Sequence, residues 1–104
     1  MQAIIENKKE DLTRLCQELK VKRLYIFGSV VSEKFNENSD LDFLFSFSDS
    51  LSTEEYTNNY FAFHYKLKAL FKRNIDLVTE SSLSNPYFIE SINETKKLIY
   101  EARN

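Results

Sequence analysis

Helical and strand-like hydrophobic patterns alternate along the chain, and this alternation is the feature that most restricts its fold. Apolar residues recur at helical spacing over residues 4–19, and a short unbroken apolar run follows at 24–27. A period of two then appears at 41–47, before a second helical stripe at 56–70. Because alternating helices and strands bury their apolar faces in shared layers, the pattern predicts an α/β (α+β) fold, a small mixed β-sheet flanked by helices.

Capping residues and a third apolar run mark the remaining elements. Ser52 and Glu55 have the spacing of a capping box at the start of the second long helix. Residues 74–78, NIDLV, indicate a third strand. Asn85 and Pro86 suit the cap and first turn of a closing helix. The apolar positions expected on that helix are Ile89, Ile92 and Ile99. The predicted order is helix, strand, short helix or loop, strand, helix, strand, helix.

Size and composition limit what this unit can do. A chain of 104 residues is expected to form a single domain, residues 1–104, with no room for a separate binding domain. The formal net charge of −2 argues against a nucleic acid as partner, since such binding usually needs a basic excess. The sequence has no signal-peptide pattern, no membrane-length apolar stretch and one cysteine, Cys16. We therefore expect a cytoplasmic protein without membrane association.

Three aspartates on the predicted strands form a candidate metal site. Asp40 and Asp42 are two residues apart, so their side chains leave the same face of a strand, with Cα atoms about 6.5 to 7 Å apart. The opposite face carries phenylalanines that must enter the core, which fixes the direction of the carboxylates. Asp76, between Ile75 and Leu77, is expected on the corresponding face of the next strand. Carboxylate oxygens suit Mg²⁺ or Mn²⁺, so a metal site competes here with a plain exposed strand edge.

Gly28 is the only glycine in the chain, and it directly follows the first strand. Ser29 comes next, and a short helix is expected to begin there. A residue without Cβ would let a phosphate approach the main-chain N–H groups and the serine hydroxyl. Taken alone, Gly28 could merely close a turn. Combined with the three aspartates, it predicts a nucleotide site.

The spacing of these residues resembles a known signature. Gly28-Ser29, ten intervening residues, Asp40-x-Asp42 and a later strand aspartate are similar to the motif of the DNA polymerase beta-type nucleotidyltransferase superfamily, in particular its minimal nucleotidyltransferases. The resemblance covers nearly the whole chain. It implies the polymerase beta-type nucleotidyltransferase fold. It also implies an enzyme that transfers AMP from ATP to an acceptor hydroxyl and releases pyrophosphate.

The resemblance also implies roles for individual residues and a partner. Asp40 and Asp42 would bind two Mg²⁺ ions, for which Mn²⁺ can substitute, and Asp76 would bind the catalytic ion and accept the proton of the acceptor. The ATP would be held by Gly28, Ser29 and Ser39. Many minimal members are encoded beside a helical HEPN toxin, which they resemble antitoxins in neutralising. Some do so by adenylylating a tyrosine of the toxin. This implies a HEPN-type partner, and it leaves the existence of a homo-oligomer open.

The sequence departs from the family pattern directly after Gly28-Ser29. Members commonly have an arginine at the next position, where this chain has Val30 and then Val31. Three cations elsewhere are candidates to replace its charge at the phosphates: Lys34, Lys72 and Arg73. Because the three metal-ligating carboxylates are retained, we expect weakened or partner-completed catalysis rather than an inactive enzyme.

Two other functions stay open at this point. The missing arginine favours an antitoxin that masks its toxin by binding without any transfer, whereas the retained carboxylates oppose this function. Transfer to a small molecule or to a nucleic-acid end would need an acceptor site. A chain of 104 residues leaves little material for one.

Three further features tempt a functional interpretation. His64 adjoins the apolar stripe of the long helix, which favours a half-buried position at the edge of the core over a catalytic base. Cys16 lies on the apolar stripe of the first helix and is most simply a core residue. The aromatic run at 61–65 has more surface than one helix face can bury, so core and partner interface are equal alternatives.

Overall fold

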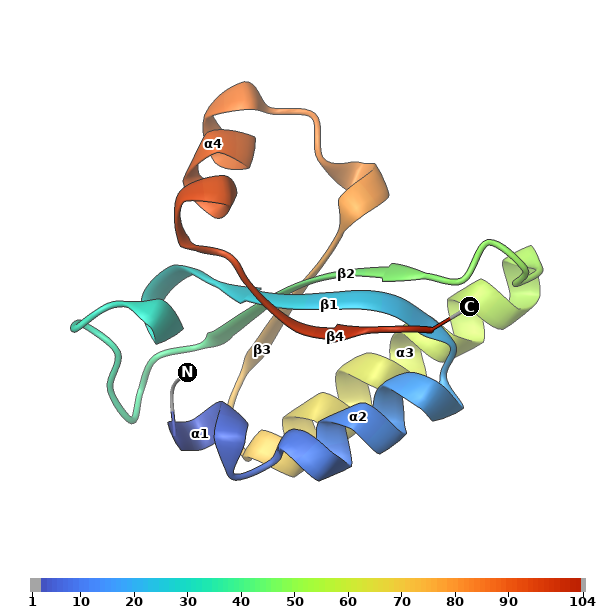
Figure 1. Cartoon of the computed structure of the whole chain (residues 1–104), viewed down its shortest axis with the longest axis horizontal. Helices are drawn as coiled ribbons and strands as arrows, with labels where there is room; N and C mark the ends of the chain where they lie inside the picture. Colours follow the sequence, from blue (N-terminus) through green and yellow to red (C-terminus); the bar gives the residue numbers. More distant parts are fainter. Residues whose placement is uncertain (1–2, 104) are drawn as a thin grey trace.

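The computed structural model describes residues 3–103, which form a four-stranded mixed sheet with helices on both faces (Figure 1). The strands are β1 (Val21–Phe27), β2 (Leu41–Phe47), β3 (Ile75–Thr79) and β4 (Lys97–Glu101), in the spatial order β3-β2-β1-β4. β1 pairs antiparallel with β2 and with β4, whereas β2 and β3 are parallel. The expected small mixed sheet is confirmed.

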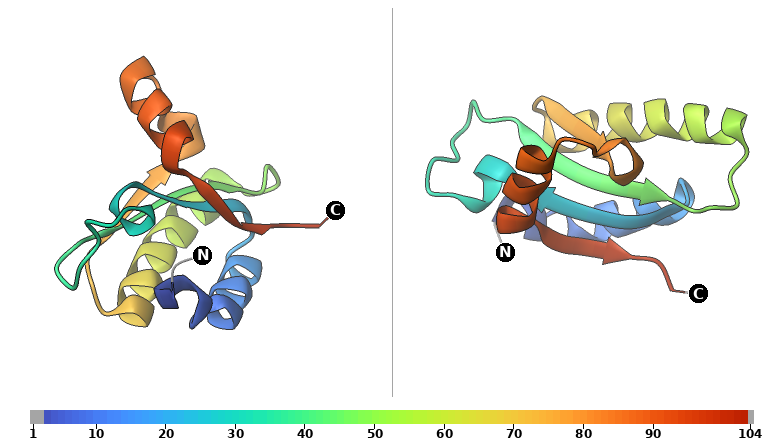
Figure 2. Two further views of the ribbon diagram at one scale, coloured as in Figure 1. Left: turned by 60° about the vertical axis from the view of Figure 1, so that its left-hand side comes forward. Right: turned by 90° about the horizontal axis from the view of Figure 1, so that it is seen from above.

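The helices lie in two layers. They are α1 (Ala3–Glu6), α2 (Lys9–Glu18), α3 (Thr53–Phe71) and α4 (Pro86–Thr95), together with two short 3₁₀ helices, η1 (Gly28–Val31) and η2 (Glu80–Ser82). α1, α2 and α3 cover one face of the sheet. α4 lies on the other face, from which it projects in Figure 2. Among the described residues, no helix is long and apolar enough to cross a membrane.

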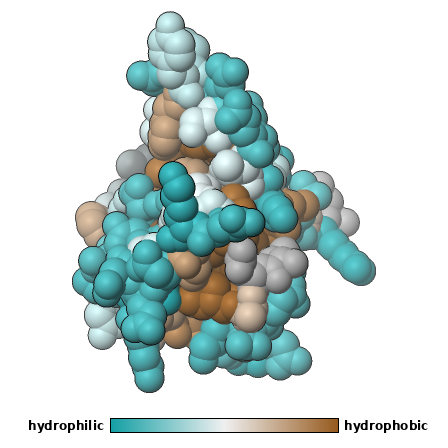
Figure 3. Space-filling view, turned by 90° about the vertical axis from the view of Figure 1, so that its left-hand side faces the viewer, coloured by the Kyte–Doolittle hydropathy of each residue, from teal (hydrophilic) through white to brown (hydrophobic). Residues whose placement is uncertain are grey.

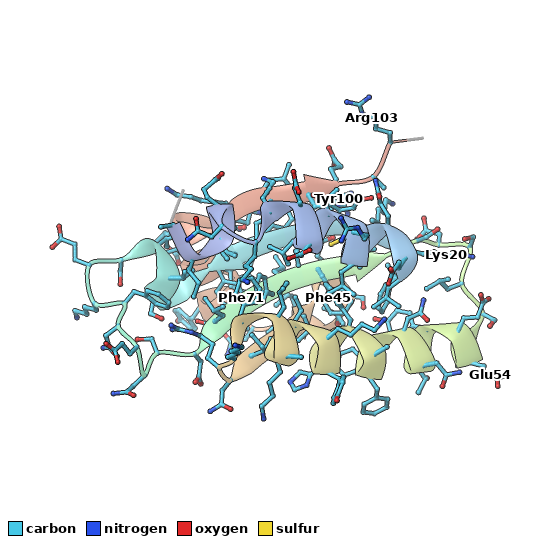
Figure 4. All side chains as sticks on the ribbon, turned by 90° about the horizontal axis from the view of Figure 1, so that it is seen from below. Lys20, Phe45, Glu54, Phe71, Tyr100 and Arg103 are labelled. Atoms are coloured by element: carbon cyan, nitrogen blue, oxygen red, sulfur yellow. The ribbon has the colours of Figure 1, made fainter. Side chains whose placement is uncertain are left out.

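The main core lies between the sheet and the layer of α1, α2 and α3. Alternate side chains of β2 enter this core, as its period of two predicts, and Figure 4 shows Phe45 and Phe71 between the sheet and α3. Phe45 and Phe63 are fully buried, and their rings meet edge to face at 5.5 Å between centroids. This packing holds β2 with its other face turned toward α4.

The face turned toward α4 is covered only in part. A small cluster there joins Phe27, Leu44 and Ile92, and Val78 and Leu83 pack against it. The apolar cover therefore protects the middle of this face. Beside Phe27, at the end where β1 finishes and β2 and β3 begin, this face carries the half-buried Asp42 and the exposed Asp76.

The two predicted caps are confirmed. Ser52 Oγ accepts the backbone N–H of Glu55 at 3.1 Å, and Glu55 Oε1 accepts the N–H of Ser52 at 3.1 Å, which completes a capping box. Asn85 Oδ1 accepts the N–H groups of Tyr87 and Phe88, with Pro86 in the first turn of α4. Both caps stabilise helix starts by satisfying N–H groups that have no partner within the helix.

The first helix differs from the prediction because it is broken. The expected continuous helix over residues 4–19 is divided into α1 and α2, with turn conformation at Asn7 and Lys8. The break changes the direction of the chain, and both Ile5 and Leu12 are fully buried on either side of it. Tertiary burial of these two side chains therefore overrides the helical periodicity of the segment.

The prediction that the closing helix carries Ile99 is wrong. α4 ends at Thr95, Lys96 is extended with ψ of 141°, and β4 begins at Lys97. β4 pairs with the outer edge of β1, opposite Tyr25 and Ile26, and Ile99 enters the main core. A spacing of seven residues from Ile92 to Ile99 fits a helix, but pairing the free edge of β1 satisfies more backbone groups.

We predict that Ser52→Ala lowers the free energy of unfolding by about 1 kcal/mol, because it removes the acceptor of the capping box. The measurement is urea denaturation of both proteins at pH 7. Ser84→Ala, which changes an exposed serine outside the helices, is the control and should leave stability unchanged. An equal stability of Ser52→Ala and wild type would contradict a contribution from this cap.

Candidate active site

Asp42 and Asp76 lie side by side on the parallel strands β2 and β3. Their Cα atoms are partners in the register of the two strands, and the backbone N–H of Leu41 donates to the carbonyl of Asn74 at 3.1 Å just before them. The neighbours of both aspartates along each strand are buried in the main core. Because side chains alternate, both carboxylates point to the face turned toward α4. The prediction that Asp76 shares a face with Asp42 is therefore confirmed.

The carboxylates of Asp40 and Asp76 act electrostatically on that of Asp42. Asp42 is half-buried, whereas Asp40 and Asp76 are exposed. The pKa of Asp42 is raised from 3.8 to about 6, first by desolvation and then by repulsion from Asp76 and Asp40. Within residues 3–103, no set of three or more histidine, cysteine or acidic side chains already has the geometry of a metal site. The three carboxylates are thus neighbours, but their side chains do not have the geometry of a metal-ligand set in this structure.

Gly28 touches the same group of residues from the end of β1. Its φ is +75°, a conformation that favours glycine. A Cβ at this position would overlap Oδ2 of Asp42 and would lie 3.4 Å from its Cγ. Phe27, just before it, is the strand partner of Asp42. The single glycine is therefore required by both the backbone conformation and the nearness of the Asp42 carboxylate.

The backbone N–H of Gly28 is already engaged. It donates to the hydroxyl of Thr95, at the end of α4, at 3.0 Å. The sequence pattern assigned N–H groups at the start of η1 to a phosphate, but the N–H of Gly28 itself points elsewhere. Thr95 was not identified from the sequence, because no local motif links it to a turn 67 residues away.

Ser29 and Ser39, the two serines expected at the nucleotide, lie in η1 and in the loop before Asp40. Ser29 is half-buried in η1, and its carbonyl accepts from both the N–H and the hydroxyl of Ser32, each at 2.9 Å. Ser39 Oγ accepts the N–H of Asn36 at 3.1 Å, next to Asp40. A hydroxyl that accepts one bond can still donate its proton. Ser39 can therefore order the loop and also donate to a ligand.

Arg73 organises the loop that leads to Asp40. Its Nη1 donates to the carbonyls of Asn36 and Ser39 at 3.1 and 2.9 Å, and its guanidinium lies over the ring of Phe35, 4.8 Å from the centroid. The side chain thus holds both ends of the turn before Asp40. Arg73 was considered from the sequence as a free cation for phosphate, but it is committed to the loop.

The other candidate cations have different surroundings. Val30, at the position where the sequence resemblance led us to expect an arginine, is fully buried in the main core, so an arginine there would have to enter apolar packing. Lys34 and Lys72 are exposed, and neither forms an ion pair among the described residues. Lys72 lines a cavity of about 440 Å³ together with Asp40 and Arg73. Of the three cations named from the sequence, Lys72 best combines a place beside the aspartates with an unengaged ammonium group.

His64 and Cys16 have the structural roles that their positions predicted. His64 is half-buried on α3, and its Nε2 bonds with the carbonyl of Ile75 at 3.1 Å, which ties α3 to the first residue of β3. Cys16 is fully buried, and burial raises the pKa of its thiol to about 12. A thiol with so high a pKa stays protonated and is a poor nucleophile.

The aromatic run at 61–65 lies partly in the core and partly on the surface, the two positions that the sequence left open. Phe63 is fully buried, whereas Phe61 and Tyr65 have 66% and 74% of their surface exposed. Phe61 lines a groove of about 500 Å³ between α3 and the end of β3, together with Tyr60 and Val78. Part of the run therefore belongs to the core and part to an exposed apolar surface.

We predict that Asp42→Asn makes the metal-free protein more stable at pH 7, by about 1 to 2 kcal/mol after allowance for solvent screening. A carboxyl whose folded-state pKa is raised opposes folding once ionised, so wild type should lose stability as the pH rises from 3.8 to about 6. Urea denaturation in EDTA at pH 4 and pH 7 measures this change. Asp49→Asn, at an exposed position, should retain the wild-type pH dependence. An unchanged pH dependence in Asp42→Asn would refute the raised pKa of Asp42.

A double-mutant cycle tests the close approach of Gly28 and Asp42. Gly28→Ala should lower the free energy of unfolding by about 2 to 4 kcal/mol, because it combines a steric overlap with an unfavourable φ. In an Asp42→Ala background the steric overlap is absent, so only the cost of the positive φ, about 1 to 2 kcal/mol, should remain. Denaturation of the four proteins gives the coupling. Equal costs in the two backgrounds would show that Asp42 does not restrict position 28.

Comparison with known proteins agrees with this arrangement. The family model described as nucleotidyltransferase domain matches residues 8–99. The protein of Methanocaldococcus jannaschii named "Putative protein adenylyltransferase MJ0126" is 35% identical over 97 residues, which cover 91% of this chain and 87% of that protein.

Solved structures share the fold. A chain of a toxin–antitoxin complex with AMP-PNP matches with a TM-score of 0.68 at 21% identity, over 91% of this chain and 74% of that chain. A chain of the complex between a tri-AMPylated Shewanella oneidensis HEPN toxin and an MNT antitoxin matches with a TM-score of 0.63 at 19% identity, over 93% and 72%.

The sequence and structural likenesses agree with each other and with the sheet that positions the aspartates. Because the family model spans most of the chain and the relative from M. jannaschii is 35% identical over most of its length, this chain belongs to the nucleotidyltransferase-domain family and has the polymerase beta-type fold.

Proposed function

We propose that this protein transfers AMP from ATP to a hydroxyl of a partner protein, and that the partner is a HEPN-type toxin which the transfer neutralises. The observation that carries the proposal is the in-register pairing of Asp42 with Asp76 beside Gly28. The relative named as a protein adenylyltransferase supports the reaction class, and the fold shared with toxin–antitoxin complexes supports the partner.

The donor set at this site fits divalent cations. All three side chains are carboxylates, the ligands that Mg²⁺ and Mn²⁺ prefer. The pKa of Asp42 is raised first by desolvation and then by repulsion from Asp76 and Asp40, which a bound cation would relieve. Asp40, Asp42 and Asp76 would hold two Mg²⁺ ions. When bound, the ions would neutralise charge on the transferred phosphate and favour ionisation of the attacking hydroxyl.

The residues of the chain provide positions for the reactants. Gly28 lets the Asp42 carboxylate lie close to the main chain, and the hydroxyls of Ser29 and Ser39 would donate to the phosphates. The acceptor oxygen forms a bond to the α-phosphorus, the bond from that phosphorus to the bridging oxygen breaks, and pyrophosphate leaves. Asp76 is exposed and accepts the proton that the acceptor loses.

A masking antitoxin without transfer is the second candidate. Two observations favour it: Val30 is buried where relatives often place a cation, and Phe61 and Tyr65 are exposed on α3 as a protein interface would require. The same partner would be bound in both cases. The two functions therefore differ in whether the partner becomes covalently modified.

We predict that wild type labels a hydroxyl of a purified HEPN-type toxin, most readily a tyrosine, when both are incubated with Mg²⁺ and α-labelled ATP. Asp76→Asn should reduce the labelling rate by roughly 10²-fold or more, because it removes the proton acceptor and a carboxylate ligand, while complex formation persists. Gel autoradiography gives the rate, and size-exclusion chromatography shows the complex. Asp49→Asn, which changes an exposed aspartate away from the site, should label at the wild-type rate.

The same experiment separates the two candidate functions. Protection of cells from the toxin by wild type and Asp76→Asn alike, with no label on the toxin in either case, would establish masking and exclude transfer. If Asp76→Asn labels the toxin at the wild-type rate, Asp76 takes no part in the reaction.

A further inference from the structure

Thr95 connects α4 to the turn at the centre of the site. It is the last residue of α4, and its Oγ1 accepts the backbone N–H of Gly28 at 3.0 Å. The same hydroxyl lies 3.3 Å from the carbonyl of Ser91 and 3.4 Å from that of Ile92, to one of which it donates. One side chain therefore joins the end of a helix to the glycine that faces Asp42.

Other helical threonines in the chain do not make such a connection. Thr13 and Thr57 donate to the carbonyls four residues before them, at 2.9 and 3.1 Å, as threonines in helices commonly do. Among the described residues, neither has a second side-chain hydrogen bond. The contact with Gly28 is thus what distinguishes Thr95 from an ordinary helical threonine.

The connection acts on a residue that has little restraint of its own. Glycine adopts negative and positive φ almost equally well, so the value of +75° at Gly28 needs support from its surroundings. A hydrogen bond to the N–H fixes the plane of the peptide that precedes Gly28. The residue on its other side, Ser29, then continues η1 in one direction.

α4 is well placed to give this support. Its inner side packs on Phe27, the residue before Gly28: Ile92 shares a buried cluster with Phe27, and the ring of Phe88 meets that of Phe27 edge to face at 6.2 Å. Tyr87 at the far end of α4 has 83% of its surface exposed. The helix rises above a face on which hydrophilic residues surround a hydrophobic area (Figure 3), and it is anchored where it meets the turn.

We propose that Thr95 is a positioning residue for the nucleotide, because its hydroxyl holds the Gly28 peptide in the orientation that presents Ser29 to the phosphates. The proposal rests on the proposed function, since it concerns the same nucleotide site. Thr95 itself does not touch the nucleotide in this arrangement. Its substitution should weaken nucleotide binding while the core remains folded.

The test compares Thr95→Val, Thr95→Ser and Thr57→Val with wild type. Two quantities are measured: hydrogen exchange of the Gly28 amide by NMR, and the dissociation constant of AMP-PNP with MgCl₂ by calorimetry. Thr95→Val should speed exchange and weaken binding, each by about tenfold, the ratio expected for one hydrogen bond of typical net strength. Thr95→Ser keeps the hydroxyl, and Thr57→Val removes a hydroxyl elsewhere. Both should stay within about twofold of wild type.

Each result has a distinct meaning. If wild type binds AMP-PNP and Thr95→Val binds it equally well, the positioning role is refuted and the proposed function stands. If Thr95→Ser loses as much affinity as Thr95→Val, the hydroxyl is not responsible, and the role is again refuted. If wild type does not bind AMP-PNP, both the proposed function and this role fail. Thr95→Ala tests the hydroxyl without the added methyl group should valine disturb the helix end.

Discussion

The parallel pairing of β2 with β3 is the constraint on which the site depends. It places Asp42 opposite Asp76, and the burial of Phe43 and Leu77 on the other face leaves the carboxylates no alternative direction. The mutual repulsion that results is unfavourable to the isolated fold. The core supplied by the phenylalanines of β2 and α3 is large enough to hold the arrangement. A stable core thus maintains a locally unstable group of charges, as is common at functional sites.

The fold and the aspartates could be predicted from the sequence because they follow from short-range periodicity. The alternation in β2 assigned Asp42 to one face and Phe43 to the other, and both capping patterns located helix starts correctly. Ile99 was misassigned because its spacing from Ile92 fits a helix as well as a strand. Only the unpaired edge of β1, which is a tertiary feature, decides between them.

The contacts that sequence analysis missed join residues far apart in the chain. Arg73 reaches back to the carbonyls of Asn36 and Ser39, and Thr95 reaches Gly28. Arginines and threonines at such positions have no distinguishing local pattern. The structure also gives a second reason for the missing arginine. Val30 is part of the core, so valine at this position contributes apolar packing as well as removing a positive charge.

β3 is an edge strand, and this affects the two aspartates differently. Asp42 belongs to an inner strand that is hydrogen-bonded on both sides, whereas Asp76 belongs to a strand with one strand neighbour. On the outer side the bond from His64 to the carbonyl of Ile75 holds the beginning of the strand. Edge strands open locally at a lower free energy than inner strands. On warming, the separation between the two carboxylates should therefore begin to fluctuate well before the phenylalanine core loses its order.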